Sequence, residues 1–90
     1  MEKRIAYIEK MELYFDTLLR AASLNPKLIQ EESPLQEMLQ ELLSYYEGGQ
    51  WLADYEADER AELPSGLKRG VLSQDGIYNL LSELSASDEN

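Results

Sequence analysis

The stretch LPSGLKRGVLSQDGIYNLL, residues 63–81, decides how the helices of this chain are arranged. Pro64 ends the helical pattern before it, and Gly66 and Gly70 permit backbone angles that other residues resist. A new helical pattern begins a few residues later. The stretch is therefore predicted to be a docking turn that brings the terminal helix against the helices before it.

The same turn carries groups that can fix it in place. Leu67, Val71 and Leu72 are expected to insert into the core. Arg69 is expected to reach back to Asp54 or Asp58, because the guanidinium fork can hold a carboxylate through two hydrogen bonds.

A second interpretation of this turn remains open. Lys68 and Arg69 come shortly before a helix that Ser73 is expected to cap, with Asp75 in its first turn. Basic side chains near free helical N–H groups are typical of small-anion sites. The glycine and lysine spacing of a nucleotide phosphate loop is missing, however.

Working outward, apolar residues at helical spacing predict three long helices, or four if the segment around Trp51 is helical. The first runs over residues 4–22. The second is expected to start at Ser33, in a capping box with Gln36, and to stop at Gly48 and Gly49. The predicted fold is all-α: a small bundle of three to four helices without a sheet, with residues 1–85 as one domain and 86–90 as a frayed acidic tail.

Composition restricts the possible functions. The 90 residues include no cysteine and no histidine, which removes thiol nucleophiles, thiolate metal sites and the commonest general base. We therefore expect no enzyme activity and no cofactor, and we assign no catalytic residue. No apolar run has membrane-spanning length and the basic start is interrupted by charges, so a cytoplasmic protein is expected.

The net charge of −10 disfavours nucleic acid and anionic membranes as partners. Ten acidic residues and one basic residue lie between positions 28 and 62. This acidic segment could attract a basic protein, although a solvated helix face is the simpler interpretation.

The acidic segment DYEADE raises the question of a metal. Asp54, Glu56 and Asp58 occupy the first, third and fifth positions of a calcium loop, but Glu59 replaces the required glycine and Ser65 the final glutamate. An EF-hand is excluded. On a helix, Asp54 and Asp58 would share one face, where they could bind a divalent cation or pair with Lys68 or Arg69.

Four residues are candidates for a protein-binding surface. Tyr46 and Trp51 flank the double glycine, and Leu13 and Leu43 lie off the apolar stripes of their helices. The partner could be another protein or a second copy of the chain.

The segments YYEGGQWLADYEADE, LPSGLKRGVLSQDGIYNLL and RIAYIEKMELYFD together resemble the small bacterial family known as domain of unknown function 4298. The resemblance covers most of the chain, and its specific part is residues 45–81. It implies a small helical protein without an assigned activity. The family pattern carries a glycine where this chain has Ala61 and a glutamate where it has Gln74.

These observations favour a non-catalytic protein-interaction module. The alternative is a protein that binds a small anion or a divalent metal through Lys68, Arg69, Asp54 and Asp58.

Overall fold

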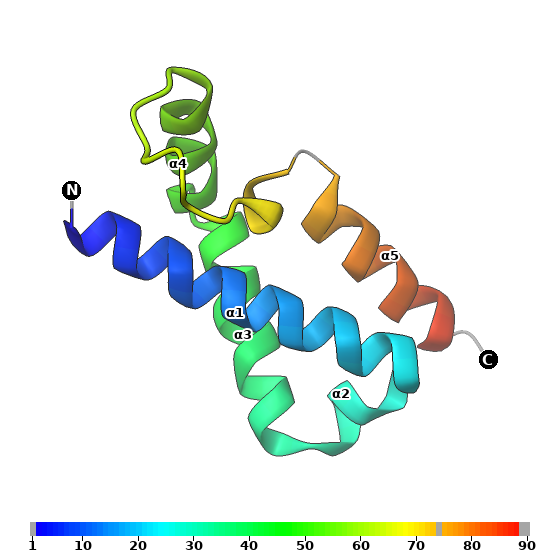
Figure 1. Cartoon of the computed structure of the whole chain (residues 1–90). Helices are drawn as coiled ribbons and strands as arrows, with labels where there is room; N and C mark the ends of the chain where they lie inside the picture. Colours follow the sequence, from blue (N-terminus) through cyan, green and yellow to red (C-terminus); the bar gives the residue numbers. More distant parts are fainter. Residues whose placement is uncertain (1, 74, 89–90) are drawn as a thin grey trace.

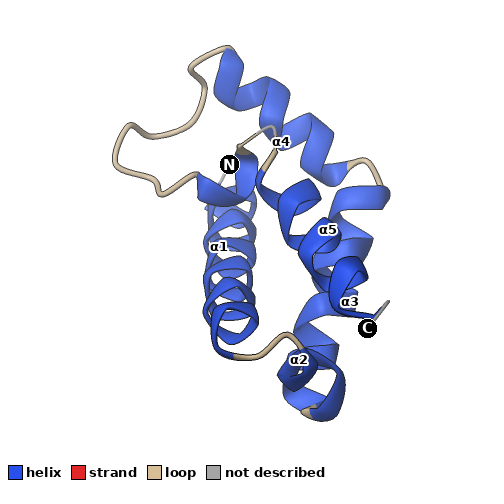
Figure 2. Ribbon diagram, turned by 90° about the vertical axis from the view of Figure 1, so that its right-hand side faces the viewer, coloured by secondary structure: helices blue, strands red, loops and turns tan. Residues whose placement is uncertain are grey.

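The computed structural model of the chain describes residues 2–73 and 75–88, and every regular element in these residues is helical (Figure 2). The predicted all-α fold without a sheet is confirmed. The elements are α1 (Glu2–Leu24), α2 (Lys27–Glu31), α3 (Ser33–Glu47), α4 (Gln50–Glu59), the 3-10 turn η1 (Gly70–Leu72) and α5 (Gly76–Asp88).

Helix α1 is the centre of the molecule and packs against α2, α3, η1 and α5 (Figure 1). In α1, apolar residues recur at steps of three and four, which predicts one buried face. The structure buries that face, since its residues Ile8, Met11, Phe15, Leu18 and Ala22 are all in the core. Helix α3 crosses α1, while α4 stands near the N-terminal end of α1 and packs against α3 and η1. The site of interest lies where α1, α4 and η1 meet.

Two local features between α1 and α3 differ from the prediction. The connection after Pro26 contains α2, which is helical because Ile29 is buried in the core and anchors this single turn. Helix α3 includes Ser33, and the residue at its cap position is Glu32. The capping box does not form, because the Gln36 side chain donates its hydrogen bond to the carbonyl of Gln30.

The double glycine separates α3 from α4, as predicted. Gly48 ends α3 with ordinary backbone angles, and Gly49 has a φ of 93° at the cap position of α4. A φ in this range favours glycine, since any side chain would crowd the backbone. The chain thus restarts a helix within two residues and turns α4 away from the axis of α3 (Figure 2).

The last helix begins later than the sequence suggested. Ser73 has an extended backbone and follows η1, and α5 starts at Gly76, so Ser73 is not its cap residue. Asp75 precedes the helix, so the expectation that it lies in the first turn was also wrong. The 3-10 turn η1 comes before α5 and buries Val71 and Leu72 in the core. Gln74 and residues 89–90 lie outside the described residues. Helix α5 continues to Asp88, past the position where fraying was expected.

Within residues 2–73 and 75–88, no helix combines the length and the apolar content needed to cross a lipid bilayer.

Candidate functional site

The connection from α4 to η1 begins with a tight helix ending. The N–H of Ala61 donates to the carbonyl of Asp58, and the N–H of Glu62 donates to the carbonyl of Ala57, both at 3.0 Å. This pair of bonds defines a Schellman motif, whose central residue must be left-handed. Ala61 occupies that position with a φ of 58°. Ala61, where the family pattern has a glycine, therefore occupies a position whose left-handed φ favours glycine.

The connection then returns to α1 (Figure 2). The backbone of Val71 fixes it there. The N–H of Val71 donates to Glu12 Oε1 at 2.7 Å, and its carbonyl accepts from the indole Nε1 of Trp51 at 2.8 Å. The Val71 and Leu72 side chains are buried, and Leu67 packs on the core. A Cβ on Gly70 would lie 3.1 Å from Glu12 Oε2, so glycine allows this close approach. Residues of α1 and α4 thus hold the turn from both sides.

Arg69 binds the end of α4, as the docking interpretation predicted. Its Nε lies 2.9 Å from Asp58 Oδ1, which is close enough for an ion pair, although the geometry is too far off line for a hydrogen bond. Its Nη2 donates to the carbonyl of Pro64 at 2.6 Å. The guanidinium therefore joins α4 to the start of the loop.

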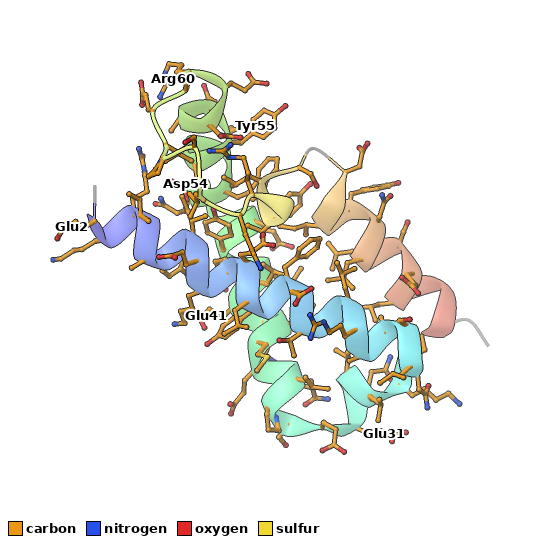
Figure 3. The ribbon with its side chains drawn as sticks, in the orientation of Figure 1. Glu2, Glu31, Glu41, Asp54, Tyr55 and Arg60 are labelled. Atoms are coloured by element: carbon orange, nitrogen blue, oxygen red, sulfur yellow. The ribbon has the colours of Figure 1, made fainter. Side chains whose placement is uncertain are left out.

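Asp54, one turn earlier on α4, is enclosed in a separate cluster. Its side chain is 0% exposed and has three partners. The Tyr45 hydroxyl donates to Oδ2 at 2.7 Å, and Gln50 Nε2 donates to Oδ1 at 3.0 Å. Arg4 forms an ion pair, with its Nε 3.0 Å from Oδ1. Figure 3 shows Asp54 on α4 close to the first turns of α1. Buried charges require such compensation, so this cluster ties α1, α3 and α4 together.

The cluster also changes the chemistry of Tyr45. Burial and then the hydrogen bond to Asp54 raise the pKa of this phenol well above its ordinary value of 10. The phenol therefore remains a hydrogen-bond donor to the carboxylate. Its ring also contacts that of Tyr7, with the centroids 5.5 Å apart.

The remaining residues of the predicted cluster are dispersed. Lys68, Ser73 and Asp75 are exposed. The charge of Asp75 contributes to a raised pKa of Tyr55, whose largest cause is the hydrogen bond between Tyr55 and Glu59. The sequence indicates six candidate residues in and around the docking turn: Asp54, Asp58, Lys68, Arg69, Ser73 and Asp75. In the structure they separate into an Asp58–Arg69 pair, an enclosed Asp54 and three surface residues.

A shared metal site is not formed by the described residues. Asp54 and Asp58 each bind a different arginine. No group of three or more acidic side chains in residues 2–73 and 75–88 is arranged to hold a metal ion.

Three of the four candidate surface residues have internal contacts. Trp51 stacks on Tyr55 and meets the edge of Tyr46, with ring centroids 5.1 Å apart in both pairs. Tyr46 and Trp51 also pack on the core, and Leu43 is half-buried. Leu13 differs, because 62% of its surface is exposed.

Leu13 lies in an open groove between α1 and the docking turn. The groove has a volume of about 470 Å³, and we call it the Leu13 groove. It is lined by three carboxylates, two cations and three further residues: Glu9, Glu12, Asp16, Arg20, Lys68, Leu13, Gly66 and Leu67. The two leucines supply its large apolar side chains.

Sequence reasoning missed Arg4, Glu12, Tyr45 and Gln50 as partners of the site. One signal was present for Asp54, since it lies three residues from both Trp51 and Ala57 and so shares the inward face of α4. An acidic residue on an inward face predicts a buried partner. The sequence contained no comparable signal for Arg4 or Glu12, which come from a different helix.

These features define a small all-α protein in which buried polar contacts fix a docking turn. The sequence model of the family described as Domain of unknown function (DUF4298) matches residues 8–89, and the chain belongs to this family. No curated protein and no solved structure matches the chain.

Proposed function

We propose that this chain is a non-catalytic protein-interaction domain whose docking surface is the Leu13 groove. The observation that carries the proposal is the exposure of Leu13 inside a hollow, beside the half-buried Leu67. Covering a leucine in this setting with a partner side chain favours binding, because apolar surface is removed from water.

The charges around the groove favour a partner with basic residues. Glu9, Glu12 and Asp16 follow one another along α1 at its edge. Asp16 pairs with the exposed Arg20, at 3.1 Å, and such pairs are readily exchanged. The net charge of −10 adds long-range attraction for a cationic segment. The proposed partner is therefore an amphipathic protein segment with apolar residues flanked by lysine or arginine.

A second copy of the chain is a less suitable occupant. It would bring the same charge of −10 to the interface, and like charges oppose association. Sedimentation at micromolar concentration tests this part of the proposal, with a monomer as the expected result.

The docking test uses a synthetic helical peptide with leucines on one face and lysines beside them. A fluorescently labelled peptide should bind the protein, as measured by anisotropy, and a version with glutamate in place of lysine should not. Leu13→Gln should weaken binding about tenfold, because burial of one leucine is worth about 1.5 kcal/mol or more.

Leu24→Gln is the matched control. Leu24 is 82% exposed on the same helix and does not line the groove, so its substitution should leave peptide affinity unchanged. Equal binding by the wild type and both variants, or equal binding of the two peptides, would contradict the proposal.

The alternative function, binding of a small anion or a metal by Lys68, Arg69, Asp54 and Asp58, has less support. Arg69 and Asp58 form an ion pair, and Asp54 is enclosed by two hydrogen-bond donors and the Arg4 ion pair. We also propose a cytoplasmic location, as the sequence suggests. Cell fractionation tests this location.

A further inference from the structure

We propose that a second hollow, at the other end of the central helix, binds a small soluble anion that carries a phosphate group. The hollow lies between the first turns of α1 and the junction of α3 with α4, and we call it the Lys3 hollow. Its volume is about 510 Å³, and it is lined by Lys3, Arg4, Tyr7, Ser44, Tyr45, Gly48 and Gln50.

The charge of the lining distinguishes the two hollows. Each hollow is lined by two cations, but the described residues that line the Lys3 hollow include no carboxylate, whereas the Leu13 groove also has three. The Arg4 charge is balanced by the buried Asp54 behind the lining, so the net positive charge of this hollow comes from Lys3, in a protein with a net charge of −10. Concave sites of this size, with a few converging polar groups, are typical of small ligands.

Arg4 is held in place before any ligand arrives. Its Nε lies 3.0 Å from Asp54 Oδ1, and Asp54 is itself fixed by Tyr45 and Gln50. About a third of the Arg4 side chain remains exposed. A guanidinium has five N–H donors, so a contact at Nε leaves the terminal nitrogens to bind an oxyanion.

The other lining residues complete a polar pocket around this cation. Lys3 adds a mobile positive charge, and the exposed Ser44 adds a hydroxyl donor. Tyr45 and Gln50 already donate to Asp54, so they form the floor and do not serve as ligands. Two cations and a hydroxyl suit the three acceptor oxygens of a phosphate monoester better than the two of a carboxylate.

The test is an NMR titration of the ¹⁵N-labelled protein with inorganic phosphate, with acetate as the comparison anion. Phosphate should shift the amide signals of Ser44, Gly48 and Gln50 in a saturable way, and acetate should bind more weakly. Lys3→Gln should weaken phosphate binding about fivefold, the loss expected for one exposed charge contact of about 1 kcal/mol.

Lys27→Gln is the control. Lys27 is an exposed lysine on α2, remote from the hollow in the chain and outside its lining, so this variant changes the net charge equally without touching the site. Equal weakening by both variants would show a general charge effect and would overturn the proposal. Ser44→Ala provides a further check, since loss of the hydroxyl should reduce affinity without altering the net charge.

A lipid headgroup offers the same phosphate chemistry, so a vesicle arm separates the two sources. The protein should not sediment with phosphatidylglycerol vesicles, because its charge of −10 opposes an anionic surface. Binding to vesicles without saturable binding of free phosphate would overturn the assignment to a soluble ligand.

Discussion

Asp54 and Asp58 lie one turn apart on α4, and each binds an arginine, yet their surroundings differ completely. Asp54 is fully enclosed, with hydrogen bonds from Tyr45 and Gln50 and an ion pair with Arg4. Asp58 is 26% exposed, and its ion-pair partner is Arg69. A buried carboxylate must have its hydrogen bonds supplied by protein, whereas water can supply them at the surface. The same residue type therefore organises three helices at one position and secures a loop at the other.

The largest predicted effect comes from removing each carboxylate in turn. Asp54→Ala should destabilise the protein by about 2–3 kcal/mol, since the buried Tyr45 hydroxyl loses its acceptor and the partly buried Arg4 loses its counter-charge. Asp58→Ala should cost about 1 kcal/mol or less, because that pair is partly solvated. Urea unfolding of both variants measures the difference, and similar losses would contradict the contrast drawn between the two sites.

A smaller effect should appear at alkaline pH. The unfolded chain releases the Tyr45 proton near pH 10, whereas the folded protein retains it, because burial and Asp54 raise the pKa of this phenol. Above pH 10 the unfolded state therefore binds fewer protons, and stability falls as the pH rises. At pH 11 this one group should remove about 1.4 kcal/mol from the free energy of unfolding.

Tyr45→Phe is the matched variant for the alkaline experiment. It should be less stable than the wild type at neutral pH, because Asp54 loses a donor. Its stability should then decline less steeply between pH 9 and 11 in urea titrations. Parallel declines in both proteins would assign the alkaline effect to other groups.

The smallest expected effect lies at the end of α4, just beyond Asp58. Ala61→Gly should stabilise the protein by up to about 1 kcal/mol, since alanine is strained at the left-handed φ of 58°. Ala53→Gly, inside α4 where the backbone is helical, should instead destabilise by about 1 kcal/mol. Opposite shifts in thermal midpoint would confirm the local cause, and shifts of the same sign would exclude it.

Much of the docking turn could be predicted from the sequence. Pro64, Val71 and Leu72 carry local signals, and the pairing of Arg69 with a carboxylate of α4 is confirmed for Asp58. The expectation that Gly66 and Gly70 adopt backbone angles that other residues resist was wrong, because neither has a positive φ. Gly70 instead leaves room for the Glu12 side chain. The expected cap at Ser73 was wrong, because the inward pull of Val71 and Leu72 creates a 3-10 turn before α5 begins. Local sequence propensity does not predict where α5 begins, because the burial of Val71 and Leu72 depends on tertiary packing.

The sequence by itself determined the class of fold and the buried face of the central helix, because apolar spacing follows helical geometry directly. Only the tertiary structure decided which carboxylate would be enclosed and which residues would enclose it. Arg4 meets Asp54, and Glu12 meets the N–H of Val71, 59 residues later in the chain. Such contacts depend on how whole helices cross, and no short-range pattern encodes that geometry.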